Sequence, residues 1–152
     1  MRLTDYTDYA LRVLMYLGAN RERLVTIQQI ASVHGISRNH LTKVVHQLAM
    51  ARLVTTVRGR TGGLRLALEP QQIMVGAVIR MTEPDFTMVE CFDEARNQCA
   101  LSPTCILKRK LAQATGAFFE QLDCLSLADV LVPGPVQAAK LVGQFQLSTT
   151  PA

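Results

Sequence analysis

Residues 26–48 read TIQQIASVHGISRNHLTKVVHQL and predict two short helices joined by a tight turn. Thr26 is a good N-cap for the first helix, and Gly35 permits a left-handed exit at its end. Ser37 is the expected N-cap of the second helix. The apolar residues of that helix recur at helical spacing and predict one buried face: Leu41, Val44, Val45 and Leu48. Two short helices around a glycine-containing turn are typical of a helix-turn-helix.

The residues that follow predict a short β-wing. Residues 54–58 and 64–68 read as two strands around the turn GRTGG at 59–63, whose glycines let it approach a sugar-phosphate backbone. Arg60 is placed to enter a narrow, electronegative minor groove. The second helix alone could be a capped surface helix of an unrelated domain, but the adjoining wing favours DNA. The expected DNA contacts come from the start of that helix and from the wing: Arg38, Asn39, His40, Thr42, Lys43, Arg58 and Arg60.

Charge is unevenly distributed along the chain. The formal net charge is +4, but residues 1–70 hold 10 Lys and Arg against 4 Asp and Glu, a net +6, whereas residues 71–152 hold 6 against 8, a net −2. A basic first half fits a surface for phosphate. Charge alone does not distinguish such a surface from an ordinary solvated basic face.

Composition predicts a folded chain outside the membrane. Hydrophobic residues make up 49% of the 152 residues, and the mean hydropathy is +0.17. The N-terminus lacks the apolar core of a signal peptide, and charges interrupt each hydrophobic stretch before the roughly 18 residues of a membrane span. We therefore expect a cytoplasmic protein with no membrane partner, whose thiols stay reduced.

A long helix is predicted in the second half, after a first helix at residues 5–20 and a short one at 75–82. Ser102-Pro103 is typical of an N-cap followed by proline at the first helical position, and the helix should run to Leu122 or Asp123. Its apolar side chains step by three or four residues: Leu107, Leu111, Ala114, Phe118 and Leu122. Because a monomer of this size has little core left to cover such a seam, we expect a two-fold homodimer.

These elements predict a mainly α-helical fold with a small β-wing: a winged helix-turn-helix domain plus a long dimerisation helix. The expected domains are residues 1–82 for DNA binding and 83–132 for a cysteine loop with the dimerisation helix. A short last helix capped by Ser126 should precede a flexible tail at 133–152.

Three cysteines, Cys91, Cys99 and Cys105, lie in the loop before the long helix. Clustered cysteines in a reducing compartment more often bind metal or do redox chemistry than form disulfides. Three thiolates are one ligand short of a four-cysteine iron–sulfur site. The spacings of seven and five intervening residues disfavour structural zinc, which usually has closer Cys pairs. Cys105 is expected at about the third helical position, where free N–H groups stabilise a thiolate.

Other candidate groups are expected to lie outside this site. Cys124 is 19 residues beyond Cys105, about 28 Å along a continuous helix, and is predicted to be a buried small hydrophobe. His34, His40 and His46 lack the spacing of a helical metal pair and are expected at the surface or facing DNA. The sequence contains no P-loop, nucleotide-binding glycine fingerprint, Gly-x-Ser-x-Gly or His-Glu-x-x-His motif, so we expect that it is not an enzyme.

Three segments carry a family resemblance: MRLTDYTDYALR at residues 1–12, GISRNHLTKVV at 35–45 and VRGRTGGLRL at 57–66. Together they resemble the Rrf2 family of bacterial winged-helix transcriptional regulators. The three-cysteine loop strengthens the match. CILK at 105–108 together with LADV at 127–130 is similar to the nitric-oxide-sensing branch of the family. The resemblance covers residues 1–132, and the combination of motifs is more specific than any single piece.

The resemblance implies a homodimer in which Cys91, Cys99 and Cys105 bind one iron–sulfur cluster per subunit, 4Fe–4S with 2Fe–2S as the alternative. In this branch a carboxylate from the partner's first helix can be the fourth ligand, and Asp8 matches that position. Arg12, four residues on, can orient Asp8 through an ion pair on the same helix face. Judged from the residues alone, Asp8 is equally well a first-turn acid that stabilises the helix N-terminus.

The function implied is a repressor that binds double-stranded operator DNA, senses nitric oxide and loses operator affinity when its cluster is nitrosylated. An alternative within the family is a regulator of iron–sulfur cluster or iron homeostasis. An alternative from another class is a zinc or thiol-redox interaction protein.

Overall fold

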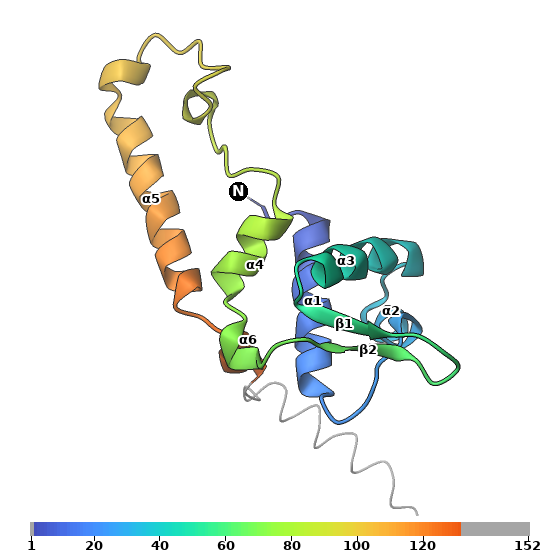
Figure 1. Cartoon of the computed structure of the whole chain (residues 1–152). Coiled ribbons are helices and arrows are strands. Elements are labelled where there is room, and N and C mark those ends of the chain that lie inside the picture. The colour runs from blue at the N-terminus through green and yellow to red at the C-terminus, as the bar shows by residue number, and fades with distance from the viewer. Residues whose placement is uncertain (1, 132–152) are drawn as a thin grey trace, which may run out of the picture.

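The computed structural model describes residues 2–131, and Figure 1 shows a winged domain from which a long arm extends. We call residues 2–83 together with the last helix the winged domain, and residues 84–123 the arm. The predicted tail at 133–152 lies outside the described residues. The elements follow in this order: α1 (Asp5–Ala19), α2 (Ile27–His34), α3 (Arg38–Met50), β1 (Val54–Val57), β2 (Gly63–Leu66), the 3₁₀ turn η1 (Pro70–Gln72), α4 (Val75–Thr82), the 3₁₀ turns η2 (Glu90–Phe92) and η3 (Ser102–Thr104), α5 (Ile106–Asp123) and α6 (Leu127–Leu131).

The helix-turn-helix forms where its caps predicted it. The Thr26 hydroxyl accepts the backbone N–H of Gln29 at 3.2 Å, and the Gln29 side chain accepts the N–H of Thr26 at 2.9 Å. This reciprocal capping box starts α2. Gly35 ends α2 with φ at 65°, in the left-handed region that side chains disfavour. Ser37 accepts the N–H of His40 at 3.3 Å and starts α3.

The core of the winged domain surrounds α1, whose Ala10, Val13 and Leu14 are fully buried. The predicted buried face of α3 is confirmed, since all four of its apolar residues are buried: Leu41, Val44, Val45 and Leu48. A fully buried Leu or Val side chain contributes roughly 1.5–3 kcal/mol. The wing is an antiparallel pair in which Val54 lies opposite Leu66. Both strands are shorter than the predicted ranges.

The chain returns to the winged domain after the arm. Met74 and Ser126 form an isolated antiparallel bridge, and the N–H of Leu127 donates to the carbonyl of Ile73 at 2.7 Å. Ser126 and Asp129 then start α6, which packs against α1. The base of the arm is therefore held by backbone hydrogen bonds.

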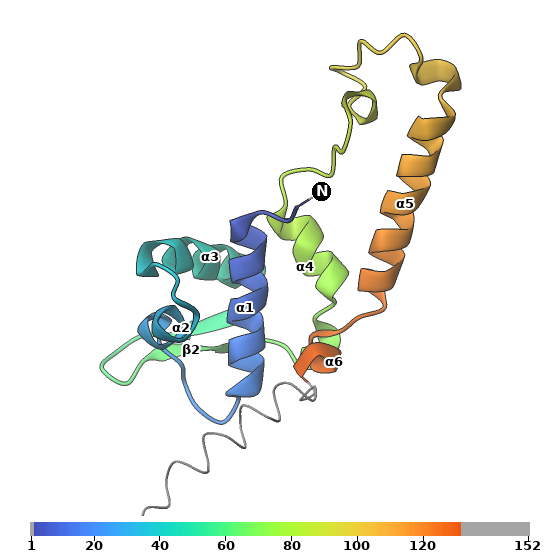
Figure 2. The ribbon, with the colours of Figure 1, turned by 180° about the vertical axis from the view of Figure 1, so that it is seen from behind.

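The arm consists of the cysteine loop and α5 (Figures 1 and 2). The C-terminal end of α5 lies beside α4, and the cysteine loop connects α4 to the opposite end of α5. No side chain of α5 is buried by the described residues. Along the predicted seam, Leu111, Phe118 and Leu122 are half-buried, and Leu107 is 64% exposed. This exposure supports the homodimer, which stays a prediction. No helix in residues 2–131 is both long and apolar enough to cross a membrane.

Candidate functional site

The outer face of α3 carries the side chains predicted to reach DNA bases. Arg38, Asn39, Thr42 and Lys43 are all exposed, because the opposite face of the helix is locked into the core. The Thr42 hydroxyl donates to the carbonyl of Arg38 at 2.9 Å, which leaves its methyl group for contacts outside the helix. An exposed helix face anchored from behind is the arrangement that enters a major groove.

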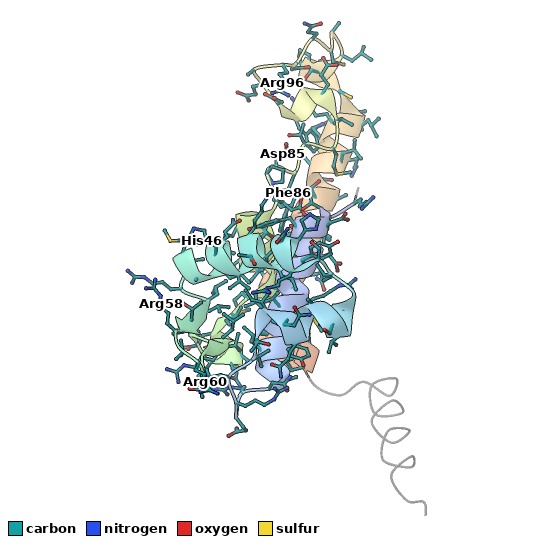
Figure 3. All side chains as sticks on the ribbon, turned by 90° about the vertical axis from the view of Figure 1, so that its right-hand side faces the viewer. His46, Arg58, Arg60, Asp85, Phe86 and Arg96 are labelled. Carbon is teal, nitrogen blue, oxygen red and sulfur yellow. The ribbon has the colours of Figure 1, made fainter. Side chains whose placement is uncertain are left out.

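The wing places two arginines beside this helix. Arg58 and Arg60 are exposed at the turn between β1 and β2, and Figure 3 shows them on the same side of the winged domain as His46. Gly59 has φ at 117°, which L-residues rarely adopt, so the turn requires glycine there. The prediction that His46 is exposed is confirmed.

His40 is exposed, as expected, but its ring lies against α1. It stacks on Tyr9 with ring centroids 6.2 Å apart. A hollow of about 360 Å³ is lined here by residues from both helices: Asp5, Tyr6, Tyr9, His40 and Lys43. The Tyr6 hydroxyl donates to the carbonyl of Lys43 at 3.3 Å. Sequence reasoning missed both tyrosines, whose spacing of three residues in α1 was the available signal.

Polar contacts also fix the first turn of α1 to the end of α4. The hydroxyl of Thr7, which is fully buried, donates to the hydroxyl oxygen of Thr82 at 2.9 Å. The carboxylate of Glu83 accepts the backbone N–H of Thr4 at 2.7 Å and its hydroxyl at 3.1 Å. The N-terminal turn of α1 is therefore held between α3 and the end of α4.

Asp8 and Arg12 form an ion pair of 2.8 Å on α1, and both side chains are almost half exposed. His34 corrects a prediction, because it is half-buried with its Nε2 buried, and that atom has no hydrogen-bond partner among residues 2–131. Its ring lies edge-on to Tyr16 with centroids 5.8 Å apart. Burial lowers the pKa of His34, the positive charge of Arg12 lowers it further, and Asp8 opposes the shift.

The start of α5 also differs from the prediction. Ser102-Pro103 opens the separate turn η3, and Cys105 has an extended backbone with ψ at 112°. The helix therefore begins at Ile106, and Cys105 is its N-cap. Its sulfur accepts the N–H of Lys108 at 3.3 Å. Cys105 therefore lies just before the helix, at the N-cap, and accepts a free N–H group of the first turn from there.

The three loop cysteines share one segment but are not gathered around one point. Cys91 and Cys105 are half-buried, Cys99 is exposed, and all are free thiols. Within the described part of the chain, no three Cys, His, Asp or Glu side chains are grouped to hold a metal ion. Glu90 accepts the N–H of Gln98 at 2.6 Å and links the two ends of the segment between Cys91 and Cys99. Three thiols are a donor set that suits an iron–sulfur cluster chemically, and to hold one they would have to lie closer together than they do here.

The remaining candidates lie away from this loop. Cys124 is the C-cap at the opposite end of α5, as its spacing predicted, but it is exposed rather than buried. α1, which carries Asp8, lies in the winged domain, and both views separate it from the end of the arm (Figures 1 and 2). Asp8 therefore lies away from the far end of the arm in its own subunit.

Comparisons with known proteins identify the relatives of this chain. The sequence profile of the Rrf2 family, described as an iron-dependent transcriptional regulator, matches residues 3–133. The HTH-type transcriptional regulator NsrR of Bacillus subtilis is 48% identical over 132 residues, which cover 86% of this chain and 90% of that protein. NsrR of Geobacillus kaustophilus is 47% identical over 132 residues, with the same coverage of each chain.

Solved structures agree with this fold. CymR, the global cysteine regulator of B. subtilis, superposes with a TM-score of 0.72 at 28% identity, covering 86% of this chain and 96% of that one. IscR of T. potens superposes with a TM-score of 0.69 at 24% identity, covering 100% and 94%, and shows the shared fold alone. The winged-helix fold class is confirmed, and the named regulators confirm that the chain is not an enzyme. The chain belongs to the Rrf2 family of transcriptional regulators.

Proposed function

We propose that this chain is a homodimeric repressor that binds double-stranded operator DNA and senses nitric oxide through an iron–sulfur cluster. One observation carries the proposal: the first turns of α1 bear Asp8 at the surface and contact α3 through Tyr6 and Tyr9. A group that binds Asp8 therefore acts on the helix that presents Thr42 and Lys43 to DNA.

The DNA-binding role is supported by the outer face of α3 and by the wing arginines. Lys43 and Arg38 are exposed on the helix, and Arg58 and Arg60 on the wing. In this arrangement the helix reads base edges while the wing arginines contact phosphate or the minor groove. Two copies related by a two-fold axis would bind a pseudo-palindromic operator.

The sensing role is supported by the cysteine loop and by the resemblance to the nitric-oxide-sensing branch. Cys91, Cys99 and Cys105 of one subunit, with Asp8 of the other, would hold one 4Fe–4S cluster per subunit, with 2Fe–2S as the alternative. When bound, a 4Fe–4S cluster held in this way would supply one iron without a thiolate ligand, which would be accessible to nitric oxide. Arg12 orients the Asp8 carboxylate for this contact through their 2.8 Å ion pair.

The contacts between α1 and α3 provide a route for switching DNA binding. Release of Asp8 frees the N-terminal turn of α1 from the partner's arm. The Tyr6–Lys43 hydrogen bond and the Tyr9–His40 stack transmit this change to α3. A typical coupling of ~1–3 kcal/mol weakens operator binding about 5–150-fold.

Regulation by iron or by cluster status is the second candidate, because the family profile is described as iron-dependent. The same three cysteines and Asp8 would serve it. It predicts that removing iron by chelation changes operator affinity while nitric oxide has no effect on the iron-loaded protein. A zinc or thiol-redox protein outside gene regulation does not agree with membership of this family.

Iron and acid-labile sulfide analysis of anaerobically purified protein tests the cluster. The wild type should contain iron and sulfide in equal amounts, with cluster absorbance. Ala substitutions of Cys91, Cys99 or Cys105 should each remove the absorbance, because an iron loses its anionic ligand. Cys124→Ala is the matched control and should keep it. Loss of the cluster in Cys124→Ala with retention in Cys99→Ala would contradict the assignment.

A further inference from the structure

We propose that a joint between α4 and α5 sets the angle of the arm and thereby fixes the distance between the two recognition helices of the dimer. The joint consists of Gly76 and Arg80 on α4 and of Phe119 and Asp123 on α5. The inference rests on the proposed function, because it requires a DNA-binding dimer assembled through α5.

Backbone hydrogen bonds tie the end of α5 to the start of α4. Next to the Met74–Ser126 bridge, the N–H of Val75 donates to the carbonyl of Leu125 at 2.8 Å. These bonds anchor the chain immediately after α5 to the residues immediately before α4. With its base anchored, α5 can still swing about that base, and its contact with α4 limits the swing.

Arg80 holds the two helices at one angle. Its guanidinium donates from both terminal nitrogens to the two carboxylate oxygens of Asp123, with Nη2–Oδ2 at 2.7 Å. The same guanidinium lies over the Phe119 ring, 4.1 Å from its centroid. A planar fork that is bound along its edge and stacked on its face has a defined orientation. Both side chains of the ion pair are 44–45% exposed, so the pair adds little stability and acts mainly on geometry.

Gly76 allows the close approach on which this contact depends. A Cβ built at Gly76 would collide with the carboxylate of Asp123 and lie 3.0 Å from its backbone nitrogen. Gly76 is the second residue of α4, so a side chain at this position would meet the end of α5. Gly116, about two turns before Asp123 in α5, offers a contrast, because a Cβ built there points into open space among the described residues.

The segment that leads to the cysteines rests on the same aromatic ring. Phe86 meets Phe119 edge-on, with centroids 4.5 Å apart and planes at 87°. Nearby, the Thr115 hydroxyl donates to the sulfur of Met88 at 3.1 Å. Figure 3 shows Phe86 at the neck between the winged domain and the arm. A rearrangement of the loop therefore reaches the joint through Phe86.

The test measures how operator affinity depends on half-site spacing. An operator is first selected by the wild-type protein from a random duplex pool about 30 base pairs long, and its half-site distance is then varied one base pair at a time. A rigid dimer should lose affinity on the order of tenfold, about 1.4 kcal/mol, at one base pair from the optimum. Asp123→Ala should flatten this loss to roughly twofold, because the clamp is gone.

Two further variants separate geometry from stability. Arg80→Lys keeps the charge but loses the planar fork, and it should give a profile between those of the wild type and Asp123→Ala. Gly76→Ala wedges α5 away from α4 and should move the optimum rather than broaden it. Unchanged melting temperatures and unchanged affinity for random DNA would show that these variants are folded.

Matched controls lie on α5 away from the joint. Gly116→Ala and Glu120→Ala should keep the wild-type spacing profile. The joint proposal is overturned if Asp123→Ala and Gly76→Ala, folded and dimeric, both keep that profile. If the wild type selects no operator with two half-sites, the proposed function itself fails and the joint fails with it.

Discussion

Every α-helix of the winged domain buries at least one side chain, whereas α5, the longest described helix, buries none among residues 2–131. The winged domain closes around α1, where Leu14 is fully buried. The arm exposes large apolar side chains near its end: Leu101 at 70%, Ile106 at 65% and Leu107 at 64%. The cysteines are also confined to one part of the chain, because all four lie between residues 91 and 124.

The two regions therefore obtain their stability from different sources. The winged domain is stabilised by its own core and can present α3 and the wing without help. The arm lacks such a core, so its helix and loop are suited to contacts supplied from outside the subunit. Exposed apolar side chains that are grouped in this way are typical of a surface that binds a partner, whereas Val33 and Met50 of the winged domain are exposed at separate places in the chain.

The largest loss of stability is expected from a substitution that creates a cavity in the core of the winged domain. Leu14→Ala should lower the free energy of unfolding by roughly 2–5 kcal/mol, because no solvent reaches the space left behind. Leu107→Ala should change it chiefly through the dimer, so its effect should depend on protein concentration. Denaturant titrations at several protein concentrations measure both. Gln113→Ala, on the other face of α5, is the control, and a concentration-independent loss in Leu107→Ala would argue against the seam.

DNA binding should respond to the winged domain and not to exposed charge on the arm. Arg60→Ala should weaken binding to operator and random duplex alike and reduce the salt slope by about one. Lys43→Ala should cost roughly 1–3 kcal/mol on the operator and relax base preference. Lys110→Ala, which removes an exposed charge from α5, is the control. Equal losses on operator and random DNA for Lys43→Ala would remove the base-reading role from α3.

The smallest expected effect is a pH dependence located in the winged domain. Burial lowers the pKa of His34 below its usual 6.5, so the folded state favours the neutral ring. The stability that this provides is present above pH 6.5 and is lost as the pH falls through the lowered pKa. The pKa values of Asp123 and Asp129 are also lowered from their ordinary value of 3.8. These carboxylates therefore affect stability only at a more acidic pH.

Urea midpoints at pH 7.5 and 5.5 measure this effect. The wild type should lose stability between the two values, and His34→Gln should lose less. His46→Gln is the control, since His46 is exposed on α3. An identical loss in wild type and His34→Gln would assign the dependence to other groups.

Local signals made the helix-turn-helix predictable from sequence. Thr26, Gly35 and Ser37 act within one turn of their own positions, and all three caps are confirmed. The start of α5 was misplaced by three residues, because Ser102-Pro103 satisfies the same local pattern in a 3₁₀ turn. The prediction that Cys124 is buried was wrong. Free cysteines are usually buried, but this general tendency does not take account of a position at an exposed helix end.

Contacts between distant segments could not be predicted in this way. The burial of His34 depends on how α2 meets α1, and the Tyr6–Lys43 bond joins residues 37 positions apart. Local patterns also give no positions for the loop sulfurs, which are not grouped around one point in residues 2–131. Family resemblance named Cys91, Cys99, Cys105 and Asp8, and these assignments stay predictions.

Operator affinity of the wild type, Asp8→Ala and Asp5→Ala, measured anaerobically before and after a nitric oxide donor, tests the central claim. Asp5 is a matched control, because it is also an exposed acid in the first turn of α1. We expect nitric oxide to weaken operator binding of the wild type and of Asp5→Ala about 5–150-fold. Asp8→Ala should keep cluster absorbance and show a much smaller change. A full response in Asp8→Ala would contradict the link between the arm and α1, and no response in the wild type would contradict nitric oxide as the signal.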